Sequence, residues 1–355
     1  MKPGFRQEHG GNRRHAQAEF GLEDVVDFSA SINPLGQPEG LREHLFAQWE
    51  EVLHYPDVGA GELRQALGRA YGLRADRVLA GNGSAELFDL ALRALAPRRV
   101  VLSPPDFGLY ARLLPLGTQV REVPRLEASA FAPDLGSLAA AAAPGDLVLL
   151  SNPSNPAGGA VGAREMRNLL ERCAGAGAWL AVDEAFSDFC PEASILADAG
   201  AAERLLVFRS LTKFYGIPGL RLGFVAGPAE ALESLSRLQV PWSVNALAQE
   251  AGIYCLARAG WPERTRAAVE TGRRHLAEGL SALPGFRPLP SSANYLLVEL
   301  SPPAPPASAL YDRLARRGLL VRHCGSFGLG ERYVRIAVRT PEENALLLAA
   351  LGEQT

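Results

Sequence analysis

Lysine is almost absent from this chain of 355 residues. Lys2 and Lys213 are the only lysines, so 34 of the 36 strongly basic residues are arginine. Arginine keeps its proton in proteins, whereas a lysine removed from water can lose its proton and act as an amine. Lys213 is therefore a candidate for amine chemistry such as a Schiff base. A single surviving lysine can equally be an accident of composition.

Several classes of protein are excluded by what else is scarce. No apolar run approaches the roughly 18 residues that span a bilayer, and the N-terminus lacks the apolar core of a secretory signal. The net charge is −3 with both signs interspersed, so neither a nucleic acid nor a membrane partner is expected. The four cysteines, Cys173, Cys190, Cys255 and Cys324, are far apart without a CxxC pair. Neither a metal site nor a disulfide framework is expected, and we predict a cytoplasmic protein.

Strand and helix patterns alternate along the middle of the chain, which has a length suited to about two domains. Such alternation predicts an α/β protein with a mostly parallel sheet between helices. Helices are expected at 85–96 and 164–175. Buried strands are expected at 100–103, 147–151, 179–183, 205–209 and 222–226.

The pattern changes after about residue 230. Helices at 230–238 and 246–259 precede strands near 295–300, 319–322 and 333–338, which predict a smaller α/β domain. Turn residues are frequent in the first 40 positions, which we expect to form an extended arm. The predicted organisation is an N-terminal arm (1–40), a large domain (41–232) and a small C-terminal domain (233–355) completed by the arm.

Polar side chains follow three of the predicted strands. Asp183 ends one strand, Lys213 comes just beyond the next, and the turn-rich segment 151–158 follows a third. Open α/β sheets bind ligands beyond the carboxyl ends of their strands, so these groups are expected to share one edge. Taken singly, an aspartate here would more often be a helix cap, and asparagine and proline are ordinary turn residues.

The loop AGNGSAE at 80–86 precedes an apolar helix. Small residues let backbone N–H groups approach an anion, and a helix N-terminus favours negative charge. A plain helix cap explains the same residues equally well. A dinucleotide fingerprint is disfavoured, because Glu86 stands where GxGxxG requires its third glycine.

An amine, a carboxylate and an anion-binding loop at one sheet edge together define a site for pyridoxal 5'-phosphate (PLP). Lys213 would form the Schiff base with the cofactor, and Asp183 would keep the pyridine nitrogen protonated so that the ring accepts electrons. The loop 80–86 would support the phosphate.

The order and spacing of these motifs resemble those of the fold-type-I aminotransferase superfamily, above all in the lysine segment SLTKFYGIPGLRLG at 210–223. More specifically, the chain resembles the threonine-phosphate decarboxylase branch, which is close to histidinol-phosphate aminotransferase. That likeness covers about residues 9–350. It rests on HGGN at 9–12, DFSASINP at 27–34, PWSVN at 241–245 and ANY at 293–295.

The resemblance implies a set of cofactor contacts. Asn155 is expected to bond the ring hydroxyl, Phe107 to stack on the ring, and Tyr55 to reach the phosphate from the other subunit of a homodimer. The phosphate itself is expected to be held by Gly83, Ser84, Ala85, Ser210 and Arg221. Many aminotransferases have tyrosine where this chain has Phe186, which cannot donate a hydrogen bond to the ring oxygen.

Substrate contacts follow from the same resemblance. Arg335 is expected to take a carboxylate and Arg322 a phosphate, while His9 and Asn33 close over the site. Guanidinium groups suit both anions, although most arginines in the chain will be solvated.

The implied reaction is decarboxylation of L-threonine O-3-phosphate to (R)-1-amino-2-propanol O-2-phosphate in cobalamin biosynthesis. The alternatives are an aminotransferase of the histidinol-phosphate type and a cofactor-binding regulator. The regulator is disfavoured because both Lys213 and Asp183 are retained and no length remains for a DNA-binding module.

Overall fold

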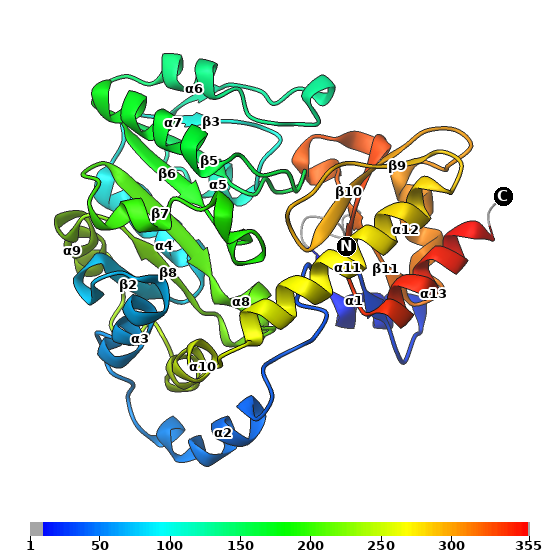
Figure 1. Cartoon of the computed structure of the whole chain (residues 1–355), viewed down its shortest axis with the longest axis horizontal. Coiled ribbons are helices and arrows are strands. Elements are labelled where there is room, and N and C mark those ends of the chain that lie inside the picture. The colour runs from blue at the N-terminus through cyan, green and yellow to red at the C-terminus, as the bar shows by residue number, and fades with distance from the viewer. Residues whose placement is uncertain (1–9, 354–355) are drawn as a thin grey trace.

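A seven-stranded sheet forms the centre of the larger of two domains (Figure 1). The structure is a computed structural model that describes residues 10–353. The sheet is parallel except for β8, which runs antiparallel to both of its neighbours. In spatial order the strands are β2 (Val78–Gly81), β8 (Gly223–Ala226), β7 (Leu205–Ser210), β6 (Trp179–Asp183), β5 (Asp146–Ser151), β3 (Arg99–Leu102) and β4 (Gln119–Glu122).

Helices cover both faces of this sheet, which explains why its central strands are apolar at nearly every position. In β5 and β7 every residue is buried. Such continuous burial is typical of parallel strands that are covered on both sides. One face packs on α3 (Gly61–Tyr71), α6 (Leu135–Ala141), α7 (Ala163–Gly175) and α10 (Ala246–Leu256). The other packs on α4 (Ser84–Leu95), α5 (Leu109–Leu113) and α9 (Ala229–Leu238).

The small domain is built on a four-stranded antiparallel sheet with its own apolar core. Its strands are β12 (Arg322–His323), β13 (Tyr333–Ala337), β10 (Tyr295–Leu300) and β9 (Phe286–Pro288). Three helices complete it: α11 (Trp261–Ser281), α12 (Ala307–Ala315) and α13 (Pro341–Gly352). The long helix α11 leads from the large domain into the small one (Figure 1).

The N-terminal segment joins the small domain. Its strand β1 (Val26–Asp27) pairs in parallel with β11 (Leu319–Leu320), and Phe28 enters the small-domain core. The expectation of a wholly extended arm was wrong, because Arg13–Phe20 form helix α1. That helix ends at Gly21, whose left-handed φ of 67° is typical of helix C-termini.

Helix α9 spans the predicted domain boundary at residue 232 and packs against α4 of the large domain. Helix α10 likewise packs on α3 and on α2 (Leu41–Ala47). By these contacts both helices lie with the large sheet, and the chain passes to the small domain along α11.

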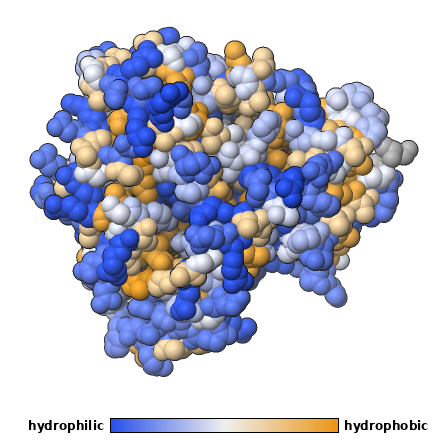
Figure 2. All heavy atoms as spheres, viewed as in Figure 1, coloured by the Kyte–Doolittle hydropathy of each residue, from blue (hydrophilic) through white to orange (hydrophobic). Residues whose placement is uncertain are grey.

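On the face seen in Figure 2, hydrophilic and hydrophobic residues are interspersed. Within residues 10–353, no helix combines the length and apolarity that crossing a bilayer requires.

Candidate active site

The carboxyl ends of the central strands meet at one edge of the large sheet, where the small domain faces them. In the register of β5 and β6, Ser151 lies directly beside Asp183. Strand β7 ends at Ser210, and the short helix α8 (Leu211–Phe214) then carries Lys213. A cavity of about 210 Å³ lies here, and both domains contribute to its lining. Its walls include Ser84, Phe107, Asn155, Asp183, Phe186, Lys213, Arg322, Phe327 and Arg335.

Lys213 meets the requirements of an amine nucleophile. Its Nζ donates a hydrogen bond of 2.9 Å to Ser210 Oγ and faces the cavity. Removal from water lowers the pKa of Lys213 to about 8, although the nearby Asp183 opposes the shift. The guanidinium groups of Arg221 and Arg335 lower this pKa further. The neutral, nucleophilic fraction of Lys213 is therefore larger than that of an ordinary exposed lysine.

Asp183 is a buried carboxylate with fixed partners. Oδ2 accepts a hydrogen bond of 2.7 Å from the hydroxyl of Tyr110, and Oδ1 accepts one of 3.0 Å from the N–H of Ala185. Burial raises the pKa of Asp183, against the lowering effects of Tyr110, Lys213 and Ala185. A buried carboxylate is stabilised by a positively charged N–H partner. A protonated pyridine nitrogen would meet that need.

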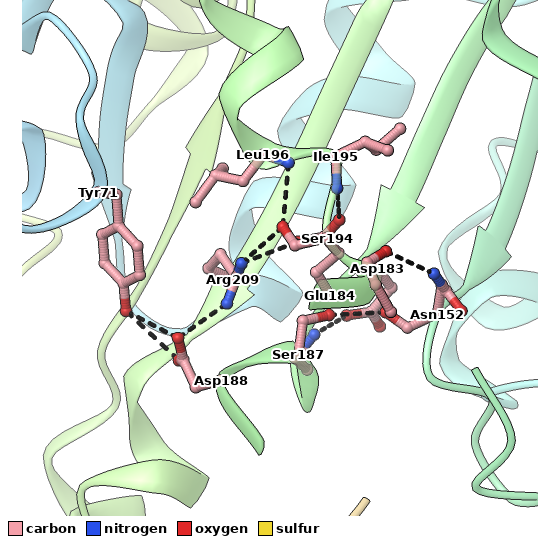
Figure 3. A network of polar contacts seen from close by, with 12 residues as sticks. Tyr71, Asn152, Asp183, Glu184, Ser187, Asp188, Ser194, Ile195, Leu196 and Arg209 are labelled. Atoms are coloured by element: carbon pink, nitrogen blue, oxygen red, sulfur yellow. Dashed lines mark hydrogen bonds and ion pairs between the residues drawn. The ribbon is translucent and has the colours of Figure 1, made fainter. Parts of the chain in front are cut away.

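An ion-pair network behind the cavity joins the ends of β6 and β7 (Figure 3). Consecutive strand residues point to opposite faces, so Glu184 and Arg209 lie on the side away from the cavity. Arg209 contacts Glu184 at 3.0 Å and Asp188 at 2.8 Å, and all three side chains are buried or nearly so. Tyr71 adds a hydrogen bond of 3.2 Å to Asp188. Because Glu184 and Arg209 adjoin Asp183 and Ser210, this network fixes the two strand ends relative to each other.

The N-terminus of α4 lies against Arg221 and is a candidate anion site. Gly83 precedes this helix with a φ of 77°, and a Cβ there would lie 2.6 Å from Arg221 Nη2. A Cβ on Gly223 would lie 2.7 Å from the backbone nitrogen of Ser84. Arg221 itself holds a strained left-handed φ of 60°. Glycines at 83 and 223 thus allow the helix N-terminus and a guanidinium to share one anion site.

Asn155 and Arg335 are linked directly. Arg335 Nη1 donates a hydrogen bond of 2.6 Å to Asn155 Oδ1, and Nη2 donates one of 3.1 Å to the carbonyl of Ser29. Since arginine can only donate, Asn155 must present its oxygen to Arg335. Its Nδ2 group is then the available donor for an oxygen on a ligand in the cavity.

A second arginine lies beside the first. Arg322 on β12 is paired with Arg335 on β13, and Arg322 Nη2 donates a hydrogen bond of 2.6 Å to Ser326. Both guanidinium groups line the cavity, within 6.0 Å of the ring of Phe327. Like charges on directly paired strand residues repel each other. Two guanidinium groups that face one cavity suit a ligand with two anionic groups.

Half of the fourteen predicted cofactor and substrate residues line the cavity: Ser84, Phe107, Asn155, Asp183, Lys213, Arg322 and Arg335. Four more do not line it but adjoin residues of the site: Gly83 and Ala85 flank Ser84, Ser210 bonds Lys213, and Arg221 lies against Gly83.

The other three predicted residues are placed differently. His9 lies outside the described residues. Asn33 does not line the cavity: its Nδ2 donates to the carbonyl of Phe214 at 2.6 Å and to Thr265 Oγ1 at 3.0 Å. Asn33 thus anchors the arm to the Lys213 segment. Tyr55 is 81% exposed and stacks on Trp242 with ring centroids 4.6 Å apart.

Tyr110 is the functional side chain that the sequence analysis missed. It lies three residues after Phe107, a spacing that places two side chains on one face of a helical turn. The two rings meet edge to face, 5.6 Å apart. The spacing from Phe107 could have placed Tyr110 near the site. Its bond to Asp183 could not be predicted, because the two residues are 73 positions apart in the sequence.

A lysine and a carboxylate facing one cavity, with a helix N-terminus beside them, define a PLP-dependent enzyme of fold type I. The sequence profile of the family "Aminotransferase class I and II" matches residues 23–351. The chain belongs to this family, and PLP is its cofactor.

Relatives of two activities resemble the chain over nearly its whole length. Threonine-phosphate decarboxylase of Salmonella typhimurium is 35% identical, covering 98% of this chain and 96% of that protein. Histidinol-phosphate aminotransferase of Symbiobacterium thermophilum is 37% identical, covering 95% and 93%. Among solved structures, L-threonine-O-3-phosphate decarboxylase from Porphyromonas gingivalis superposes with a TM-score of 0.81 at 27% identity, covering 92% of this chain and 98% of that chain.

The lowered pKa of Lys213 predicts how the apoprotein captures PLP. The neutral amine attacks the cofactor aldehyde, so the capture rate is expected to rise as the pH increases through about 8 and then to level off. Stopped-flow absorbance between pH 6 and 10.5 would measure it. A rate still climbing towards the ordinary lysine pKa of 10.5 would contradict the effect of burial.

Proposed function

We propose that the protein decarboxylates L-threonine O-3-phosphate, releasing CO2 and (R)-1-amino-2-propanol O-2-phosphate for cobalamin biosynthesis. The observation that carries the proposal is the pair Arg322 and Arg335, placed on paired strands and facing the same cavity as Lys213. Two guanidinium groups suit a substrate with two anionic ends. The 35% identity to a threonine-phosphate decarboxylase supports the same substrate.

Each side chain then has a separate task. Arg335 holds the substrate carboxylate and Arg322 the phosphate, which orients the bonds at the α-carbon. The bound cofactor supplies a conjugated ring that accepts the electron pair of the breaking bond. Asp183 keeps the ring nitrogen protonated, and Asn155 donates to the ring oxygen. Lys213, which faces the same cavity, returns a proton to the α-carbon.

The second candidate is aminotransfer, favoured by the 37% identity to a histidinol-phosphate aminotransferase. The same two arginines would hold both carboxylates of a dicarboxylic amino donor. Phe186, in place of the tyrosine common in aminotransferases, favours the decarboxylase.

Release of CO2 distinguishes the two candidates. Purified, PLP-loaded protein is given L-threonine O-3-phosphate without an oxo acid. Many CO2 molecules per active site are expected. No release, together with amino transfer from histidinol phosphate once 2-oxoglutarate is added, would support the aminotransferase instead.

Arg322 is predicted to decide between phosphorylated and free threonine. Arg322→Leu should lower kcat/KM for L-threonine O-3-phosphate about 100-fold, the loss expected for a charged hydrogen-bonded pair. Any activity on free threonine should change little. Arg164→Leu, at a surface side chain that is 86% exposed, is the control. An equal loss on both substrates would contradict a phosphate-specific role.

A cluster of exposed apolar side chains supports a homodimer. Its members lie on two segments that the stacked Tyr55 and Trp242 hold together. They are Phe46, Trp49, Val52, Leu53, Tyr55, Val58, Leu238, Val240 and Trp242, between 37% and 81% exposed. Apolar clusters of this kind commonly mark protein interfaces. We propose that a second copy covers this cluster and that Tyr55 reaches the cofactor phosphate of that copy.

Breaking this interface should therefore also weaken cofactor binding. Leu53→Asp is expected to give monomers by light scattering and to raise the PLP dissociation constant at least tenfold. Leu116→Asp, a fully exposed leucine outside the cluster, should leave both unchanged. Monomers that bind PLP normally would argue against the crossing of Tyr55.

A further inference from the structure

A buried carboxylate lies behind the cavity and accepts hydrogen bonds from three residues. Asp106 Oδ1 accepts from its neighbour's N–H, that of Phe107, at 2.8 Å and from the hydroxyl of Ser151. Oδ2 accepts from the N–H of Ser151 at 3.1 Å and from Arg125 Nη2 at 2.7 Å. Asp106 does not line the cavity, so any influence on a ligand must pass through its partners.

Arg125 clamps this carboxylate from behind. Its side chain has no exposed surface, and its Nε donates to the carbonyl of Ser103 at 2.9 Å. The guanidinium therefore bonds both Asp106 and the end of β3. A buried carboxylate without such a partner is costly, and the charge of Arg125 offsets part of that cost.

Ser151 links Asp106 to Asn155 by two hydrogen bonds. Its hydroxyl hydrogen goes to Asp106, so its oxygen is left to accept the N–H of Asn155 at 3.0 Å. One carboxylate thus holds the backbone of Phe107 directly and that of Asn155 through a single hydroxyl. These are the residues proposed to contact the cofactor ring on its face and at its oxygen.

We propose that Asp106, Ser151 and Arg125 form a positioning unit that sets Phe107 and Asn155 together, so that stacking and the ring-oxygen hydrogen bond form in one geometry. The inference rests on the proposed roles of Phe107 and Asn155. It assigns function to three residues that touch neither substrate nor cofactor.

The variant Ser151→Ala breaks the link to Asn155 and leaves the bond between Asp106 and Phe107. Weakening the donor to the ring oxygen concentrates negative charge there and raises the pKa of the nitrogen joining PLP to Lys213. An increase of about one pH unit is expected, the size of one hydrogen bond to a charged group. The PLP dissociation constant should rise about tenfold.

Ser103→Ala is the matched control. Ser103 is also buried at a strand end, but its hydroxyl donates to the carbonyl of Val123. For each variant we would titrate the visible band of Lys213-bound PLP with pH and measure the unfolding temperature of the apoprotein. Both variants should destabilise the apoprotein, whereas only Ser151→Ala should shift the titration.

An unchanged titration and PLP affinity in Ser151→Ala, while wild type titrates normally, would overturn the inference. Wild type without a PLP band at Lys213 would instead overturn the proposed cofactor roles. If Ser151→Ala does not fold, Asp106→Asn tests the same unit, because one amide cannot accept from donors on both sides. The same upward shift is expected there, and its absence would equally refute the unit.

Discussion

Replacement of Lys213 by arginine is expected to reduce turnover by about 10⁴-fold or more, the scale seen when a covalent catalyst is removed. Arginine is positively charged and slightly longer than lysine, but its guanidinium stays protonated and cannot bond to the cofactor aldehyde. The loss would therefore come from missing amine chemistry, with the local charge preserved.

Chemical reduction of the bond between PLP and the protein shows whether Lys213 is the residue that carries the cofactor. Borohydride reduction of the PLP-loaded wild type should fix the cofactor on the peptide that contains Lys213, and the variant should retain none. Lys2→Arg is an unusually clean control, since it removes the one other lysine of the chain. Full activity of Lys213→Arg would remove the central assignment of the active site.

Replacement of Asp183 by asparagine is expected to lower kcat by about 10²- to 10³-fold, as for other fixed electrostatic contacts at a reacting centre. The amide has nearly the same shape but no charge, so it cannot keep the pyridine nitrogen protonated. PLP should still bond to Lys213, because that step needs only the neutral amine.

Tyr110→Phe tests the hydrogen bond to Asp183 separately from the charge of Asp183. It removes the 2.7 Å bond to Asp183 but keeps the carboxylate, so a loss of tenfold or less is expected. Steady-state rates of the two variants, measured at equal PLP occupancy, test whether Asp183→Asn loses more activity than Tyr110→Phe. Unchanged turnover in Asp183→Asn would show that another group protonates the ring.

Strands buried on both faces were predictable because their apolar runs are continuous. The runs at 147–151, 179–183 and 205–209 match β5, β6 and β7 to within one residue at either end. Strands β2, β4 and β9 were missed. They have only three or four residues, and every side chain of β4 is exposed. Short strands of this kind are defined by their pairing partners more than by their own composition.

Some residues of the candidate site could be predicted from the sequence and others could not. Lys213 and Asp183 could be proposed from the ends of consecutive strands, since neighbouring strands bring such residues together. Arg125 could not be singled out among 34 arginines, because its significance comes from a contact with Asp106. Asn33 shows the opposite case: resemblance placed it over the substrate, while the structure commits its amide to Phe214 and Thr265.

The path of the N-terminal arm limits how far the two domains can separate. Asp27 is paired into the small domain, and six residues later the N–H of Asn33 donates to the carbonyl of Lys213 at 3.0 Å. Six residues of extended chain reach about 20 Å at most. The arm therefore works as a short tether from the small domain to the nucleophile itself. Opening the cavity beyond this length would require breaking the hold on the segment that carries Lys213.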